Sequence, residues 1–329
     1  MHRVFASSAR PTTPWRAPQA ADRYGVTAKP SWREVDWQRH LHRVEIDGSM
    51  VNYVDIGSGE GTPVVFVHGL GGQWQNWLEN IPRAAQDRRV VAPDLPGFGM
   101  SALPREDITI PGYARCVEAL CEHLDLGAVA MVGNSMGGFI SSEVAIQFPE
   151  RVERLVLVSA AGISSAAAHR APLQLAGRVA GALTAYSAAR QRQLAKRPIG
   201  RHMALAFVAR HPSRIAADLA WEGLFKGAAK PGFQDALRAN LVYDFRERLH
   251  EIRCPTLIVW GENDSIISVQ DAAEFERLIP DSRKLVMKDT GHVPQLERPE
   301  ALNEVLMEFL AEPGPAEAKE PVEGESQVA

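Results

Sequence analysis

The chain has 329 residues, 45% of them hydrophobic and 23% charged, and a formal net charge of −4. These values are typical of a globular protein with one large α/β domain or two ordinary ones. The small negative charge gives no support for nucleic-acid binding. No run of about eighteen apolar residues is present that would predict a membrane-spanning helix.

Three cysteines, Cys116, Cys121 and Cys254, lie in apolar segments without metal-ligand spacing. Their odd number and their surroundings indicate buried thiols in a reducing compartment, with no disulfide framework and no metal site. The N-terminal segment lacks the apolar stretch of a secretory signal. We therefore expect a cytoplasmic protein that uses no metal and no cofactor.

Both ends of the chain differ in composition from its middle. Residues 1–35 begin with a stretch that bears arginine and is rich in proline, and they are interpreted as a disordered leader. Residues 312–329 are dominated by proline, glycine, alanine and glutamate, so a disordered acidic tail is expected there. The folded part is thus predicted to lie between these two segments.

Strand-like and helix-like segments alternate in the middle of the chain. A hairpin with its turn at Asp47-Gly48-Ser49 comes first. Continuous apolar strands separated by helices then indicate a parallel sheet covered on both faces, with the hairpin at one edge. The strands are expected near 42–47, 50–56, 63–67, 89–92, 128–132, 155–158, 256–260 and 284–287, and the helices near 74–87, 110–124, 136–148, 268–279 and 299–311.

The segment 162–250 contains no convincing strand, so we expect a helical cap inserted at the carboxyl edge of the sheet. Between Ala160 and Ala217 there are nine arginine or lysine residues and no acid. We interpret this bias as an electrostatic feature suited to an anionic membrane surface or an amphiphilic substrate. The cap also has an apolar stripe, interpreted as packing on the core, which consists of Leu175, Val179, Leu183 and Tyr186.

The segment Gly133-Asn134-Ser135-Met136-Gly137 follows a strand-like run and precedes a helix-like run that should stop at Pro149. A serine between two glycines on a sharp strand-to-helix turn is the arrangement that exposes a nucleophilic hydroxyl above a sheet edge. Small residues around a serine also occur in ordinary loops. The strand–turn–helix context favours Ser135 as a nucleophile.

A serine nucleophile needs a base, usually histidine, and the base needs an acid that holds its tautomer. His292 lies in the loop after the last predicted strand and could reach over the sheet edge. His68 ends a strand in a glycine-rich loop, which suits oxyanion-binding N–H groups better than a base. Asp264 and Glu262 both follow the strand at 256–260. Asp264 is the favoured acid, and Glu262 suits a turn-stabilising role.

The order Ser135, Asp264, His292 is the chain order of the α/β-hydrolase fold, and residues 42–311 resemble that superfamily. Asp94 also ends a strand, but it precedes the serine in the chain and is therefore interpreted as a residue that shapes its own loop. Five segments carry the resemblance: His68-Gly69-Leu70-Gly71, Asp94-Leu95-Pro96-Gly97-Phe98-Gly99, and residues 133–137, 261–264 and 291–294.

The resemblance implies an α/β-hydrolase core at 36–161 and 251–311, with a mostly parallel sheet flanked by helices and the cap at 162–250. It assigns Ser135 as nucleophile, His292 as base and Asp264 as the orienting acid. It also makes the backbone N–H groups of Leu70 and Met136 the oxyanion hole. An N–H at a helix N-terminus, as expected for Met136, suits a developing negative charge.

The resemblance also bears on the substrate. A serine nucleophile argues against the dehalogenase and epoxide-hydrolase branches, which use aspartate. The sequence around Ser135 is similar to hydrolases that cleave C–C bonds in aromatic ring-fission products, yet those enzymes usually carry tryptophan after the catalytic histidine. Val293-Pro294 follow His292 here, as in many carboxylesterases and monoacylglycerol-type lipases.

We therefore expect a serine esterase or lipase with a small-molecule ester substrate, and with a lipid surface as a further partner of the basic cap. The alternatives are a C–C bond hydrolase and a non-catalytic ligand-binding protein on the same scaffold. The sequence does not indicate the oligomeric state.

Overall fold

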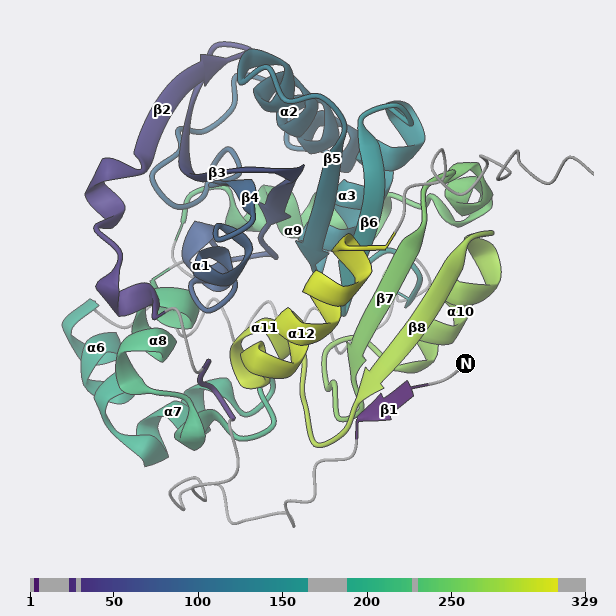
Figure 1. Cartoon of the computed structure of the whole chain (residues 1–329). Helices are drawn as coiled ribbons and strands as arrows, with labels where there is room; N and C mark the ends of the chain where they lie inside the picture. Colours follow the sequence, from purple (N-terminus) through teal and green to yellow (C-terminus); the bar gives the residue numbers. More distant parts are fainter. Residues whose placement is uncertain (1–2, 6–23, 28–30, 165–187, 227–229, 313–329) are drawn as a thin grey trace, which may run out of the picture.

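The computed structural model describes residues 3–5, 24–27, 31–164, 188–226 and 230–312 (Figure 1). Its centre is an eight-stranded sheet with the order β1-β8-β7-β6-β5-β3-β2, and β4 pairs with β3. The expected mostly parallel sheet flanked by helices is confirmed. The strands are β1 (Arg3–Phe5), β2 (Leu41–Ile46), β3 (Ser49–Val67), β4 (Arg88–Pro93), β5 (Val129–Asn134), β6 (Val152–Val158), β7 (Thr256–Gly261) and β8 (Ser282–Met287).

Helices cover both faces of this sheet. The longer ones are α2 (Ile110–His123), α3 (Met136–Gln147), α6 (Ala188–Lys196), α7 (Pro198–Leu205), α9 (Phe233–Val242), α10 (Gln270–Leu278) and α12 (Pro299–Leu310). The short ones are η1 (Trp32–Glu34), η2 (Trp37–Arg39), η3 (Trp74–Trp77), α1 (Ile81–Ala84), η4 (Pro212–Arg214), α8 (Ala217–Ala220), η5 (Trp221–Phe225), η6 (Arg246–Glu251) and α11 (Pro294–Glu297).

Two sequence predictions of local structure are wrong. The strands expected at 50–56 and 63–67 form one strand, β3, because β4 pairs with both of its halves across register shifts between Ile56 and Val65. The helix expected at 74–87 is divided into η3 and α1. Pro82 explains this division, since proline in a helix interior lacks the N–H that the preceding turn requires and is tolerated only in a first turn.

The core has two parts, one on each face of the sheet. One part joins the sheet to α2, α3, α9 and α10, and the other joins it to η3, α1, α11, α12 and the cap helices α6 to α8. In α2, the buried Ile110, Tyr113, Val117 and Leu120 recur at helical spacing, and Thr109 caps its first turn by accepting from the Gly112 N–H. Packing on both faces leaves the carboxyl ends of the parallel strands free to carry loops.

The part of 162–250 that the structure describes is helical and lies between β6 and β7. Figure 1 shows α6, α7 and α8 grouped together beyond one end of the sheet. The apolar stripe of Leu175, Val179, Leu183 and Tyr186 lies outside the described residues. None of the described helices combines the length and the apolar character needed to cross a membrane.

The expected boundaries of leader, core, cap and tail stay predictions, with a qualification at the N-terminus. Residues Arg3–Phe5 pair in parallel with β8, and the Tyr24 side chain is fully buried. These parts of the leader are therefore ordered. The three cysteines are free thiols, and burial raises the pKa of each to about 12, so they are protonated at neutral pH.

Candidate active site

Ser135 lies between β5 and α3 in a strained backbone conformation, with φ +55° and ψ −121°. A non-glycine residue adopts such angles only when its surroundings impose them. Its N–H donates to the Val158 carbonyl of β6 (3.0 Å), and its carbonyl accepts from the Ala161 N–H (3.0 Å). The end of the neighbouring strand thus fixes the turn from both sides.

The two glycines around Ser135 are required by close packing. A Cβ at Gly133 would lie 2.3 Å from the Gly137 carbonyl oxygen, and a Cβ at Gly137 would lie 2.2 Å from the Val67 carbonyl oxygen. Strand β5, helix α3 and the end of β3 therefore meet without space for side chains. This contact is the physical reason for the glycine pattern around the serine.

His292 and Asp264 meet at the carboxyl ends of β7 and β8. The Nδ1 atom of His292 lies 2.8 Å from Oδ2 of Asp264, whose side chain is fully buried. The other oxygen, Oδ1, accepts the backbone N–H groups of Ile266 (2.8 Å) and Ile267 (2.9 Å). These two bonds leave Oδ2 facing the imidazole, the arrangement in which a carboxylate holds a histidine tautomer.

The loop that carries His292 is attached to its neighbours at three points. The side-chain amide of Asn134 donates to the His292 carbonyl (3.2 Å), and the His292 N–H donates to the Val208 carbonyl of the cap (2.8 Å). A Cβ at Gly261 would lie 1.9 Å from the Gly291 carbonyl oxygen. The ends of β5 and β7 and the cap therefore set the main-chain position of His292.

The loop after β3 lies beside the serine. A Cβ at Gly69 would lie 3.1 Å from the Ser135 Cβ, which brings the segment containing Leu70 next to the nucleophile turn. Met136 is the first residue of α3, directly after Ser135. Both candidate oxyanion residues thus belong to segments that border Ser135, where backbone N–H groups can stabilise negative charge.

His68 has a structural role in this loop. Its Nε2 accepts the Leu95 N–H (3.0 Å), so the neutral ring carries its proton on Nδ1, which lies 2.8 Å from the Gly69 carbonyl oxygen. Burial lowers the pKa of His68 to about 4. The ring is therefore neutral at physiological pH and ties the loop after β3 to the loop after β4.

Asp94 and Glu262 also have local structural contacts. The buried Asp94 carboxylate accepts from the Trp74 N–H, the Met100 N–H and the Asn52 side chain, as expected for a loop-shaping residue. Glu262 is exposed and accepts from the Asp289 N–H at 3.4 Å. Neither carboxylate has a hydrogen bond to His292 among the described contacts.

Sequence reasoning missed three groups around His292: the Val208 carbonyl, Tyr24 and Glu297. Neither Tyr24 nor Glu297 carries a sequence signal for this place, because their proximity depends on tertiary contacts. Within the described residues, no group of three or more His, Cys, Asp or Glu side chains is placed to hold a metal ion. A cavity of about 550 Å³ lies between residues 103–111 and α9, and no candidate catalytic residue lines it.

Comparisons with known proteins place the chain among hydrolases. A family described as "alpha/beta hydrolase fold" matches residues 62–299. The acetyltransferase component of the acetoin cleaving system of Pseudomonas putida is 34% identical, over 82% of this chain and 68% of its own length. The 2-hydroxy-6-oxo-2,4-heptadienoate hydrolase of Pseudomonas putida F1 is 31% identical, over 80% of this chain and 94% of its own. A solved bacterial membrane phospholipase A is 26% identical with a TM-score of 0.65, over 82% of this chain and 85% of its own.

Proposed function

Since the chain belongs to the α/β-hydrolase fold family, we propose that it is a serine hydrolase that cleaves carboxylic esters of small or medium acyl groups, monoacylglycerols included. The hydrogen bond between His292 Nδ1 and Asp264 carries this proposal, because it holds an imidazole with its Nε2 free to accept a proton. The strained Ser135 between β5 and α3 supplies the nucleophile.

The proposed reaction has two acyl-transfer steps. The Ser135 hydroxyl attacks the ester carbonyl while His292 Nε2 takes its proton, and the N–H groups of Leu70 and Met136 stabilise the oxyanion. The oxyanion collapses, the proton passes from His292 to the alcohol, and the alcohol leaves. Water then attacks the acyl-enzyme, His292 takes its proton and returns it to Ser135, and the carboxylic acid is released.

Val293-Pro294 after His292 favours an ester substrate over a C–C bond substrate. The similarity to the heptadienoate hydrolase supports C–C bond cleavage as the second candidate, with the same serine and histidine. A panel of p-nitrophenyl esters, monoacylglycerols and a ring-fission dienoate distinguishes the two. Turnover of the dienoate far above that of every ester would reject the ester proposal.

Labelling with a fluorophosphonate tests the catalytic assignment independently of the substrate. We expect the wild-type protein to be labelled on Ser135, and the Ser135→Ala variant and a heat-denatured sample to remain unlabelled. Absence of labelling in the folded wild-type protein would favour a ligand-binding protein on the same scaffold.

We also propose that the cap contacts an anionic lipid surface. Ile199 and Met203 lie one turn apart on α7 with 60% and 78% of their surface exposed, and the exposed Lys196 and Arg197 precede them. Exposed apolar residues beside cations suit the interface of an anionic membrane. The similarity to the membrane phospholipase A supports this proposal.

Binding to anionic vesicles tests the lipid proposal. Replacing Ile199 and Met203 by serine should weaken binding, and added salt should weaken it further by screening the cations. Val242→Ser is the control, because Val242 is 69% exposed on α9, away from these cations in the sequence. Equal binding by all variants at all salt concentrations would reject the proposal.

A further inference from the structure

Glu297 is a fully buried carboxylate at the end of α11, five residues after His292. Its two oxygens accept the backbone N–H groups on either side of His292: that of Gly291 at 2.9 Å and that of Val293 at 3.2 Å. One side chain therefore binds the main chain immediately before and immediately after the candidate base. No other described carboxylate does so.

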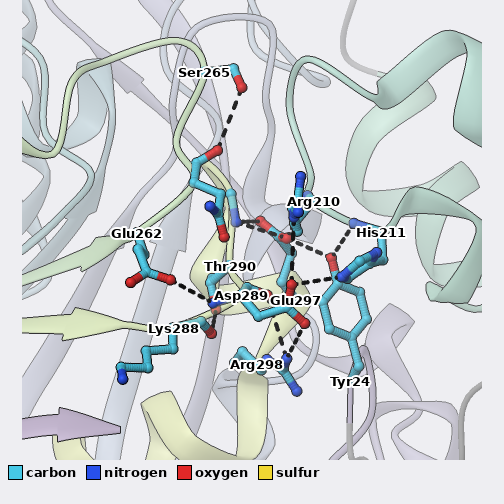
Figure 2. A network of polar contacts seen from close by, with 12 residues as sticks. Tyr24, Arg210, His211, Glu262, Ser265, Lys288, Asp289, Thr290, Glu297 and Arg298 are labelled. Carbon is cyan, nitrogen blue, oxygen red and sulfur yellow. Dashed lines mark hydrogen bonds and ion pairs between the residues drawn. The ribbon is translucent and has the colours of Figure 1, made fainter. Parts of the chain in front are cut away.

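Two further donors reach the same carboxylate from distant parts of the chain. The Arg210 N–H of the cap donates to Oε2 at 2.7 Å, and the Tyr24 hydroxyl donates to it at 2.5 Å. Figure 2 shows Tyr24, Arg210 and Glu297 converging in this network. The leader, the cap and the histidine loop thus share one acceptor.

Tyr24 connects the leader to the cap as well. Its hydroxyl accepts the His211 N–H at 2.8 Å, and the Gly25 N–H donates to the Glu297 carbonyl at 2.8 Å. The guanidinium groups of Arg214 and Arg298 each lie 4.8 Å from the centre of the Tyr24 ring. The tyrosine is held by these contacts and not only by burial.

All the described hydrogen-bond partners of the Glu297 carboxylate are donors. Burial raises its pKa, whereas the hydrogen bonds from Tyr24, Arg210, Gly291 and Val293 act in the opposite direction. A buried anion is tolerated when such donors replace its hydration. A glutamine side chain at this position would place its amide hydrogens among backbone N–H groups. Those amide hydrogens would then have no acceptor.

We propose that Glu297 is a positioning residue that holds His292 in its reactive place and makes that place depend on Tyr24 of the leader and on residues 208–211 of the cap. This proposal rests on the proposed serine hydrolase function. Glu297 acts through the main chain of residues 291–293, a role that requires no contact with the substrate. The leader and the cap then contribute to activity without supplying a reacting group.

The matched comparison uses Glu297→Gln and Glu79→Gln in the full chain. Glu79 is also buried and also binds the leader, accepting from the Thr27 hydroxyl at 2.6 Å and from the Trp32 indole at 2.9 Å, but the described contacts do not connect it to residues 291–293. Tyr24→Phe is the third variant, since it removes only the hydroxyl. Their melting temperatures measure the purely structural effect.

Two readouts separate positioning from stability. The first is the second-order rate of Ser135 labelling by a fluorophosphonate, which should fall about 100-fold in Glu297→Gln because a small displacement of the base has an effect of this size. The second is the deshielded NMR signal of the His292 Nδ1 proton shared with Asp264, which should shift or broaden. Tyr24→Phe should show a smaller change in both, and Glu79→Gln should show the wild-type rate and signal.

Each result decides between the alternatives. Wild-type labelling and a wild-type signal in Glu297→Gln would overturn the proposal, and so would equal losses in Glu297→Gln and Glu79→Gln at equal melting temperatures. If Glu297→Gln does not fold, Tyr24→Phe gives the answer by the same readouts. If the wild-type protein is not labelled at all, the serine hydrolase function fails, and the His292 signal alone tests the positioning role.

Discussion

The side-chain amide of Asn134 donates to the main-chain carbonyl of His292 at 3.2 Å and to that of Val158 at 3.0 Å. The residue before the candidate nucleophile thus joins the loop of the candidate base to the end of β6. The first of these hydrogen bonds attaches the loop of the candidate base to the strand end that leads into the candidate nucleophile. Any change that loosens this attachment should affect both residues together.

The strained backbone at Ser135 predicts different stabilities for two variants that both lack the hydroxyl. Ser135→Ala and Ser135→Gly should both lose activity, by roughly 10⁴-fold or more, because both lack the hydroxyl. Only glycine adopts φ +55° and ψ −121° without strain, so Ser135→Gly should be more stable than Ser135→Ala by about 1 kcal/mol. Thermal unfolding of the two variants measures this difference, and an alanine variant as stable as the glycine variant would contradict it.

Replacing Asp264 by asparagine should stop catalysis without unfolding the protein. The asparagine oxygen would take over the N–H groups of Ile266 and Ile267, which leaves its amide nitrogen facing His292 Nδ1. The ring would then carry its proton on Nε2 and could not accept one from Ser135, a change that lowers kcat by about 10⁴-fold. Steady-state kinetics on a p-nitrophenyl ester measure the loss.

Glu262→Gln is the control for this experiment. Glu262 lies two residues from Asp264 and is exposed, and among the described contacts its carboxylate has only a long hydrogen bond, to the Asp289 N–H. Its kcat should equal that of the wild-type protein. A similar loss of kcat in both variants would contradict the assignment of Asp264 as the acid that orients His292.

Adding a methyl group at Gly137 should disturb the junction of β3, β5 and α3. The new Cβ would lie 2.2 Å from the Val67 carbonyl oxygen and 2.7 Å from that of His68, and a rigid backbone cannot yield as a side chain would. We expect Gly137→Ala to reduce stability by about 3 kcal/mol and to reduce activity further than stability explains. Gly127→Ala is the control, because nothing lies within 4 Å of its new Cβ.

Chemical denaturation followed by fluorescence, together with activity at a temperature where both variants are folded, tests this prediction. Gly127→Ala should change the free energy of unfolding by no more than about 0.5 kcal/mol. An unchanged free energy of unfolding in Gly137→Ala would show that β3, β5 and α3 can separate without loss of stability.

The buried neutral His68 predicts a loss of stability in mild acid. Its pKa is about 4 in the folded protein and 6.5 without burial, so the unfolded chain binds the proton more readily. The stabilising contribution is complete above pH 6.5 and is lost as the pH falls towards 4, with about 2 kcal/mol lost between pH 7 and 5.

A variant isolates this effect from other titrating groups. Burial raises the pKa of Asp94 and Glu297, which gives these carboxyls a pH dependence of opposite sign. The difference in unfolding free energy between wild type and His68→Gln should therefore shrink by about 2 kcal/mol from pH 7 to 5. Parallel pH curves for the two proteins would contradict the assignment of a neutral ring.

The candidate catalytic residues could be proposed from the sequence because each of them follows a strand. In a parallel sheet the carboxyl ends of all strands meet at one edge, so Ser135, Asp264 and His292 could be expected together from their order alone. The structure brings Asp264 and His292 into contact at 2.8 Å. The division of the helix near residue 80 was also within reach, because Pro82 breaks a helix interior by a local rule.

The network around Glu297 could not be predicted in the same way. Its partners are separated from it by as many as 273 residues, and three of them are backbone N–H groups that leave no mark in the sequence. The same holds for Val208, which binds His292 through its carbonyl. Contacts made by the main chain depend on tertiary placement and not on residue type.

Main-chain contacts also join the cap to the core, and they bear on how the substrate specificity could be altered. The Val208, Glu222 and Gly223 carbonyls accept from His292, Gln73 and Asn76, and the Gly232 N–H donates to the Gly97 carbonyl. These attachments use main-chain atoms of the cap, so exposed cap side chains elsewhere can be exchanged without removing them. The fold thus separates an exchangeable surface, which could adapt to a different substrate, from the fixed connections that hold the loop of the candidate base.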